Sequence, residues 1–198
     1  MSEGGPIRGA DGLLRCPWAR DADGYEDYRT YHDTEWGHPL HGDDQLYERL
    51  SLEAFQSGLS WLTILRRREG FRAAFADFHL ETVARFTDAD RERLLADPGI
   101  IRNRAKIDAA IGNARAALGV AESYEGGLDA LIWSYAPDPG SRPAPRTIAD
   151  VPATTPESTA LAKDLKKRGF RFVGPTTAYA LMQACGLVND HLVGCHAR

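Results

Sequence analysis

The segment KKRGFRFVGPT, residues 166–176, joins the last two helical patterns of the chain. Gly169 follows a predicted helix over about 157–168, and Pro175 introduces another over 176–186. A helix start leaves its first backbone amides without a partner in the helix, and Pro175 has no amide N–H of its own. The neighbouring amides therefore point outward and suit a phosphate oxygen. The candidate phosphate contacts are Lys166, Lys167, Arg168, Gly169, Gly174 and Thr176. The alternative is an ordinary turn between two helices, where a glycine is common.

The helical period also dominates the chain upstream of this segment. Asp43 or Asp44 can cap a helix that carries Leu46 and Leu50 and ends at Gly58. Further helices are predicted from Ser60 through the arginine triplet 66–68, from Thr87 to a point before Pro98, over 107–118 and over 128–135. No segment shows a period-two alternation bounded by turns, so the sequence predicts an all-α protein.

The prolines indicate how the chain is divided. Six of the eleven lie at 137, 139, 143, 145, 152 and 156, which predicts a proline-rich connector over about 137–156. We expect a single domain over 15–198, made of two helical lobes that this connector separates. Residues 1–14 are rich in glycine and aperiodic, and they are predicted to form a flexible tail.

Composition limits the function classes. A chain of 198 residues with 43% hydrophobic and 26% charged residues is typical of a soluble globular protein. It contains neither an apolar run of about 20 residues nor a signal-peptide pattern, so we expect no membrane association and a cytoplasmic location. Three cysteines favour a reducing compartment over a disulfide framework.

The net charge of −4 argues against a generally basic nucleic-acid-binding protein. Basic residues nevertheless gather in three groups, at 66–68, 102–106 and 163–171. They can form one phosphate-binding face on an acidic body, or they can be separate solvated helix faces and helix ends, where cations are favoured. Charge alone leaves both interpretations open.

Each end of the chain carries one thiol and one imidazole. Cys16 and His32 lie near the start, and His191 and Cys195 lie near the finish. Two cysteines and two histidines form one of the ligand sets of tetrahedral zinc, and a metal bound here would tie the two terminal segments together. The alternative is a buried thiol and two surface histidines that lie near the termini by chance, because no tight paired-cysteine spacing is present.

Glu53 lies within an apolar stretch of the first long helix. Its position three residues after Leu50 places it on the inward face, where a carboxylate is costly unless it pairs or binds a ligand. Several aromatic residues precede or follow it in the first third of the chain: Trp18, Tyr28, Tyr31, Trp36 and Trp61. Aromatic walls with one carboxylate are typical of a pocket for a flat cationic ring. The alternative is an aromatic core with Glu53 facing solvent.

Six longer blocks of sequence are RCPW (15–18), YHDTEWG (31–37), GLSW (58–61), GIIRNR (99–104), KKRGF (166–170) and MQACGLVNDH (182–191). In this order they resemble the bacterial 3-methyladenine DNA glycosylase I family. The blocks run through almost all of residues 15–195, and together they are far more specific than any single motif.

The resemblance implies a helix-hairpin-helix DNA glycosylase fold in which a zinc ion joins the terminal segments. The implied ligands are Cys16, His32, His191 and Cys195. With four protein ligands the zinc is structural, since no position is left for a catalytic water. Cys185 lies outside this set and is expected to be a packed thiol.

The resemblance also implies hydrolysis of the N-glycosidic bond of 3-methyladenine in double-stranded alkylated DNA, with the free base as product. Glu53 is then the catalytic and base-reading residue in a pocket walled by Trp18, Tyr31, Trp36 and Trp61. Leu59 is a candidate wedge that fills the gap left by the flipped nucleotide. Whether Asp190, Glu53 or no side chain activates the water is left open, and we expect a monomer.

Two other function classes compete with this interpretation. A non-enzymatic DNA-binding protein would use the hairpin and the basic groups alone, and it would bind DNA regardless of alkylation. A metal-dependent hydrolase would use Glu53 as a general base, and chelation would abolish its turnover without unfolding it.

Overall fold

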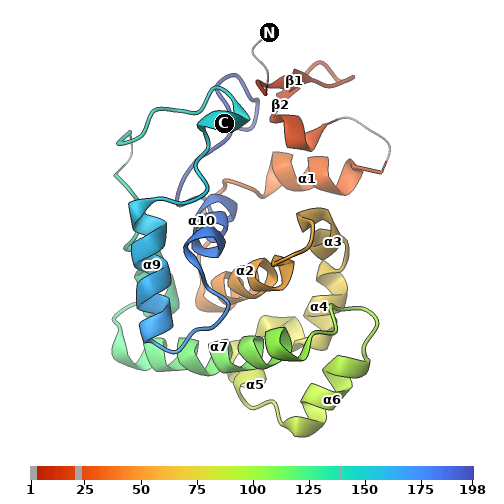
Figure 1. Ribbon diagram of the computed structural model, residues 1–198, viewed down its shortest axis with the longest axis vertical. Helices are drawn as coiled ribbons and strands as arrows, with labels where there is room; N and C mark the ends of the chain where they lie inside the picture. The colour runs from red at the N-terminus through yellow and green to blue at the C-terminus, as the bar shows by residue number, and fades with distance from the viewer. Residues whose placement is uncertain (1–3, 21–23, 139) are drawn as a thin grey trace.

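Helices dominate the computed structural model, which describes residues 4–20, 24–138 and 140–198 (Figure 1). The α-helices are α1 Glu26–Thr34, α2 Asp43–Gln56, α3 Trp61–Arg66, α4 Arg68–Ala74, α5 Leu80–Ala84, α6 Asp88–Ala96, α7 Arg104–Ser123, α8 Gly127–Trp133, α9 Pro156–Lys167 and α10 Pro175–Ala184. Short 3₁₀ turns lie at Pro17–Ala19, Ala76–Phe78 and Ile148–Asp150. α7 crosses the molecule and packs against α2, α5, α6 and α8.

Capping side chains set several helix boundaries. The Ser60 hydroxyl accepts a hydrogen bond from the Thr63 amide at 3.2 Å, which begins α3. Thr87 and Asp90 form a capping box that begins α6. These two predicted caps are confirmed, because a short polar side chain here satisfies an amide that the helix leaves unbonded. The predicted cap at Asp43 or Asp44 is wrong: both residues lie in the first turn of α2, and their carboxylates accept from the Asp129 and Leu80 amides instead.

The predicted continuous helix through residues 66–68 is wrong. α3 ends at Arg66 and α4 begins at Arg68, with φ −99° and ψ 0° at Arg67. Arg67 donates to the Pro98 carbonyl at 2.7 Å, and Arg68 donates to both oxygens of the Glu35 carboxylate at 2.6 and 2.9 Å. These tertiary contacts override the local helical pattern.

One cluster of buried apolar side chains holds the helices together. It includes Leu50 of α2, Ile107 of α7, Leu161 of α9 and Met182 of α10, so it extends to both sides of the proline-rich connector. The described residues of the connector that precede α9 contain one 3₁₀ turn and otherwise no helix or strand. The division into two helical lobes stays a prediction.

A short antiparallel ribbon lies near the N-terminus. β1 Ile7–Arg8 and β2 Leu14–Arg15 pair with Ile7 opposite Arg15. The all-α expectation is wrong here, because strands of two residues are too short to show a period-two pattern. Residues 1–3 lie outside the described residues, and the flexibility expected of 1–14 stays a prediction.

The hairpin between α9 and α10 is anchored to α7. The Asn113 side chain accepts a hydrogen bond from the Arg171 amide at 2.8 Å and donates to the Arg171 carbonyl at 3.1 Å. Gly169 has a φ of +96°, a conformation that glycine adopts without a steric penalty. The hairpin is therefore held in one orientation relative to the centre of the molecule.

The C-terminal segment returns to the N-terminal ribbon, next to α1 (Figure 1). The His196 amide donates to the Leu14 carbonyl at 2.8 Å, and the Val193 amide donates to the Pro145 carbonyl at 2.8 Å. The terminal segments and the connector thus meet at one end of the molecule. None of the described helices combines the length and the apolar composition that a bilayer span requires.

Candidate functional site

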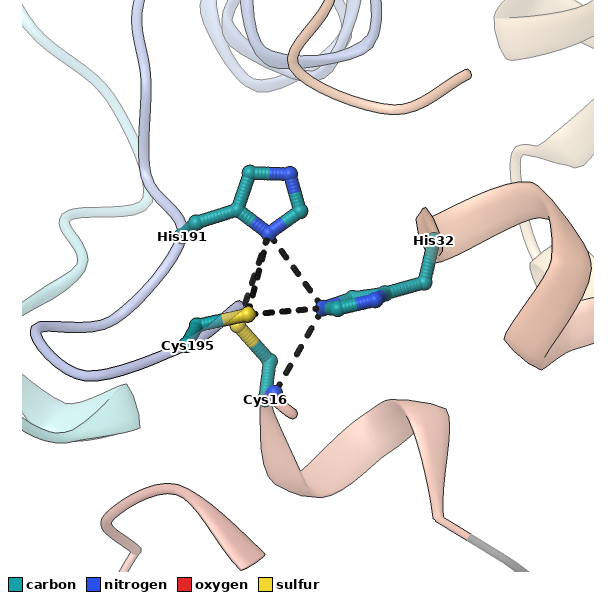
Figure 2. A group of neighbouring side chains, drawn as sticks. All are labelled: Cys16, His32, His191 and Cys195. Atoms are coloured by element: carbon teal, nitrogen blue, oxygen red, sulfur yellow. Dashed lines mark hydrogen bonds between the residues drawn. The ribbon is translucent and has the colours of Figure 1, made fainter. Parts of the chain in front are cut away.

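Two thiols and two imidazoles from the two ends of the chain meet in one buried cluster (Figure 2). Cys16 precedes the first 3₁₀ turn, His32 lies on α1, and His191 and Cys195 follow α10. All four side chains are buried, and their ligand atoms lie within 4.8 Å of one another. The structure therefore brings together all four residues that the sequence nominates as metal ligands.

The distances within this cluster match the edges of a tetrahedron. His191 Nδ1 lies 3.2 Å from His32 Nε2, and Cys195 Sγ lies 3.5 Å from His32 Nε2 and 3.6 Å from His191 Nδ1. Cys16 Sγ lies 3.8 Å from His191 Nδ1. Zinc bonds of about 2.0 Å to nitrogen and about 2.3 Å to sulfur give edges of about 3.3 Å between nitrogens and about 3.6 Å between nitrogen and sulfur. The donor set fits a tetrahedral metal ion.

Hydrogen bonds outside the cluster orient both imidazoles. His32 Nδ1 lies 2.7 Å from Asp33 Oδ1, and His191 Nε2 lies 2.8 Å from the Trp36 carbonyl oxygen. Since both oxygens are acceptors, each of these outer nitrogens carries a proton, and the two inner nitrogens present lone pairs. Two lone pairs at 3.2 Å repel each other, and a cation between them would turn that repulsion into attraction.

Cys195 is also suited to a cation. A hydrogen bond from Cys16 lowers the pKa of Cys195, even though burial opposes ionisation, whereas that hydrogen bond and burial raise the pKa of Cys16. The Leu192 amide donates to Cys16 Sγ at 3.4 Å, which favours negative charge on that sulfur. Thiolate is the form of cysteine that binds metals.

A cavity of about 280 Å³ lies beside α1, α2, α3 and α10. Its lining residues come from distant parts of the chain and are Trp18, Tyr28, Tyr31, Trp36, Glu53, Gln56, Trp61, Ile148, Val151, Ala180, Gln183 and Asp190. All five residues that the sequence nominates for substrate binding are among them. The volume is near the lower end of the range for ligand pockets, about 300–1,000 Å³, which suits one small ring system.

Aromatic contacts connect the cavity wall to the metal-ligand cluster. The Trp18 ring packs edge-on against Trp36, with 5.1 Å between centroids, and against His32 at 4.8 Å. Trp36 in turn packs against His191 at 4.7 Å. Two cluster side chains therefore support two indoles of the wall directly. A separate pair, Tyr31 and Trp61, packs at 5.4 Å.

Glu53 is a buried acid at this cavity. Its side chain is on α2, the residue is 6% exposed, and its carboxylate accepts no hydrogen bond from the described residues. Burial raises the pKa of Glu53 to about 8, against a smaller lowering by the Arg49 guanidinium. A buried ionisable group without a partner at a cavity wall is typical of a ligand-binding site.

Asp190 is a second buried acid at the same cavity. Its Oδ2 accepts hydrogen bonds from the Tyr179 hydroxyl and from Gln183 Nε2, the latter at 3.0 Å. Its Oδ1 accepts from the Arg142 guanidinium at 3.2 Å. Sequence reasoning left the role of Asp190 open and missed these three donors. Gln183 lies inside one of the six sequence blocks, whereas Arg142 lies in the connector, where no motif marks it.

Comparisons with known proteins identify the family. The family model described as methyladenine glycosylase matches residues 18–198. The DNA-3-methyladenine glycosylase 1 of Escherichia coli strain K12 is 47% identical over 185 residues, which cover 92% of this chain and 96% of that protein. The chain belongs to the methyladenine glycosylase family. The resemblance of the six sequence blocks is thereby confirmed.

Solved structures of this family share the fold of this member. A crystal structure of 3-methyladenine DNA glycosylase I superposes with a TM-score of 0.86 and 45% identity, over 93% of this chain and 99% of that chain. A variant of 3-methyladenine DNA glycosylase I in complex with 3-methyladenine has a TM-score of 0.81 and 36% identity, over 87% and 92% of the two chains.

The predicted DNA contacts of this family member lie in two segments, the turn between α2 and α3 and the region from the end of α9 to the start of α10. Leu59 is 41% exposed in the turn between α2 and α3. Lys166, Lys167, Gly169 and Thr176 are exposed, and Gly174 is half-buried. The Arg168 guanidinium already makes one hydrogen bond within the protein, because its Nε donates to Asp164 Oδ1 at 3.1 Å. These DNA contacts stay predictions.

A single basic face that includes Lys106 is ruled out. Lys106 is buried, and its ammonium donates to the carbonyls of Phe55 at 2.9 Å and Ser57 at 2.6 Å. These carbonyls end α2, where the helix dipole favours a cation. Arg68 is likewise occupied by Glu35. Lys106 fits the alternative of a cation at a helix end, whereas the ion pair of Arg68 was not foreseen by either interpretation.

Proposed function

We propose that this protein hydrolyses the N-glycosidic bond of 3-methyladenine in double-stranded alkylated DNA and releases the free base. The observation that carries the proposal is an aromatic-walled cavity of about 280 Å³ with a buried carboxylate, Glu53, that accepts no hydrogen bond within the described chain. A ring methylated at N3 is flat and positively charged, so stacking and electrostatic attraction both favour its binding here. A family relative has been crystallised with 3-methyladenine.

The chemistry of the lesion explains why binding is most of the task. Methylation at N3 weakens the glycosidic bond, because the base then leaves as a neutral molecule. The protein must flip the nucleotide out of the duplex, hold the ring and admit water to C1′, and flipping costs a few kcal/mol. Trp18, Trp36 and Trp61 supply stacking surfaces. Glu53 accepts a hydrogen bond from the amino group of adenine, a position where guanine has an oxygen acceptor.

The environment of Glu53 couples its charge to the charge of the ligand. In the free protein, burial favours the neutral acid. A cationic base in the cavity favours the carboxylate, so binding of the base and ionisation of Glu53 reinforce each other. Undamaged adenine is neutral and gains nothing from this coupling. The site therefore favours the alkylated base over the normal one.

Contacts with the DNA backbone are assigned to α9, the hairpin and α10, which together form the helix-hairpin-helix element of this proposal. The free amides at the start of α10 suit a phosphate, and the exposed Lys166 and Lys167 add charge nearby. Leu59 has the exposure that a wedge residue needs. A cytoplasmic location and a monomeric state remain predictions from the sequence.

Zinc is the metal that we propose for the cluster of Cys16, His32, His191 and Cys195. The support is the donor set, the tetrahedral distances and the outward hydrogen bonds of both imidazoles. The bound ion would supply a rigid link between the terminal segments. Four protein donors leave no position for a water molecule, which disfavours a metal-dependent hydrolase.

Incubation with methylated duplex DNA, followed by chromatography of the released bases, tests the activity. We expect 3-methyladenine to be released while the sugar–phosphate backbone stays intact. Binding to methylated and unmethylated DNA alike, with no base released, would overturn the proposal and favour a non-enzymatic DNA-binding protein. Metal analysis of the purified protein, with about one zinc per chain expected, tests the cluster separately.

A further inference from the structure

The side-chain amide of Gln183 is fixed at the cavity wall by Asp190. Both residues line the cavity, and Gln183 Nε2 lies 3.0 Å from Asp190 Oδ2. The backbone of Gln183 is held as well, because its carbonyl accepts a hydrogen bond from the Gly37 amide at 3.1 Å. The position of this amide relative to the Trp36 segment is therefore set by the fold.

The partners of Asp190 determine which end of the Gln183 amide faces it. Asp190 is 3% exposed, and it also accepts hydrogen bonds from the Tyr179 hydroxyl and the Arg142 guanidinium. Arginine is always protonated, and burial raises the pKa of Tyr179, so both groups act as donors. A carboxylate that is held by such donors can only accept, so Gln183 must present its NH₂ group to Asp190.

The opposite end of the amide is then free to act as an acceptor. Gln183 Oε1 accepts no hydrogen bond in the described part of the chain, and Gln183 is only half-buried. The Glu53 carboxylate and Gln183 Oε1 are therefore two of the cavity's acceptors that have no donor within the described chain, and the amide of Gln183 is fixed by Asp190. The two acceptors come from different helices, α2 and α10.

We propose that Gln183 Oε1 is a second acceptor for the exocyclic amino group of the flipped base, and that Asp190 acts as the positioning residue that keeps this oxygen toward the cavity. The proposal rests on the proposed function and names a determinant of its specificity. An adenine amino group carries two N–H donors, so it can satisfy two acceptors. A guanine presents O6 at that position, which leaves both acceptors without a donor, and a site built to pair with a donor rejects such a ligand strongly.

Release of 3-methyladenine and of 3-methylguanine from the same methylated DNA tests the proposal. Gln183→Met keeps the length of the side chain and removes both the acceptor and the donor. We expect the rate of 3-methyladenine release to fall about tenfold, as for the loss of one hydrogen bond, with little change for 3-methylguanine. Quenching of tryptophan fluorescence should show about tenfold weaker binding of free 3-methyladenine to the variant.

Asp190→Asn tests the positioning role, because an asparagine amide can donate to Gln183 Oε1 and allow the glutamine amide to turn. We expect the ratio of 3-methyladenine to 3-methylguanine release to fall in the wild-type background and to stay constant in the Gln183→Met background. A general loss of structure would lower both rates together and would not change this ratio. Gln45→Met, the same exchange at an exposed position of α2, is the control for substitution itself.

The outcomes separate this inference from the proposed function. A folded Gln183→Met protein with the wild-type ratio and the wild-type affinity for free 3-methyladenine overturns the role of Gln183. An equal effect of Asp190→Asn in both backgrounds overturns the positioning role and shows that Asp190 acts independently. A wild-type protein that releases no methylated base overturns the proposed function itself.

Discussion

Glu53 and Asp190 are two buried carboxylates at one cavity, and their surroundings are opposite. Asp190 accepts hydrogen bonds from three side chains, whereas Glu53 accepts none from the chain as described. A carboxylate that internal donors saturate serves to hold its neighbours in place. A carboxylate that lacks them destabilises the fold and is available to a ligand. The comparison indicates a structural role for Asp190 and a ligand-binding role for Glu53.

Removal of the Glu53 charge is expected to have the largest effect on activity. Glu53→Gln preserves the shape of the side chain but loses the charged acceptor. Hydrogen bonds that involve a charged group contribute about 1.5–3 kcal/mol, so we expect release of 3-methyladenine to fall up to about 100-fold. Single-turnover release from methylated DNA measures this change.

Glu125→Gln is the matched control, because Glu125 is exposed and does not line the cavity. It should release 3-methyladenine at the wild-type rate. An unchanged rate for Glu53→Gln as well would remove Glu53 from the site, and the contrast between the two acids would lose its meaning.

The next largest effect is expected at the metal-ligand cluster, which supports the indoles of Trp18 and Trp36. Cys195→Ser removes one thiolate, so we expect loss of bound zinc and a fall in melting temperature on the order of 10 °C. Metal analysis and thermal unfolding measure the two effects. Cys185→Ser, at a buried thiol outside the cluster, should retain its zinc. Full zinc content in Cys195→Ser would contradict the ligand set.

Glu53 and the four candidate metal ligands were accessible to sequence reasoning because their signals are local or chemically restrictive. The helical period places Glu53 on an inward face, and two cysteines with two histidines form a known zinc ligand set. The residues that saturate Asp190 could not be found in this way. Arg142 reaches Asp190 from an irregular connector, and 48 residues separate them, so neither periodicity nor motif indicates the contact.

Two errors of the sequence analysis, at Lys106 and at the arginine triplet, have the same physical origin. Lys106 lies in a run of basic residues, but its ammonium is buried because it donates hydrogen bonds to the carbonyls at the end of α2. The arginine triplet continues a helical pattern, but Glu35 and the Pro98 carbonyl divide it into two helices. In each case a distant hydrogen-bond acceptor prevails over a local preference, and acceptors of that kind are visible only in three dimensions.

The two acids should also differ in how they affect stability with pH. Burial raises the pKa of Glu53 from 4.5 to about 8, so the folded state binds this proton more tightly than the unfolded state does. The stabilising contribution is complete below about pH 4.5 and is lost as the pH rises through about 8. The wild-type melting temperature should therefore fall relative to that of Glu53→Gln, by about 10 °C between pH 5 and pH 9. If the melting temperatures of the two proteins changed equally with pH over this range, Glu53 would titrate as an exposed acid.

The smallest effect is expected from the loss of one donor to Asp190. Tyr179→Phe removes the hydroxyl that donates to Oδ2, while Gln183 and Arg142 still donate to the carboxylate. A partly unsatisfied buried carboxylate costs about 1 kcal/mol, so the melting temperature should fall by about 3 °C. Tyr28→Phe is the control, because the Tyr28 hydroxyl makes no hydrogen bond among the described residues of this cavity, and its melting temperature should stay unchanged. If Tyr179→Phe has the melting temperature of the wild type, the Tyr179 hydroxyl is not needed to satisfy Asp190. The difference in hydrogen bonding between Asp190 and Glu53 would then matter less for stability than we infer.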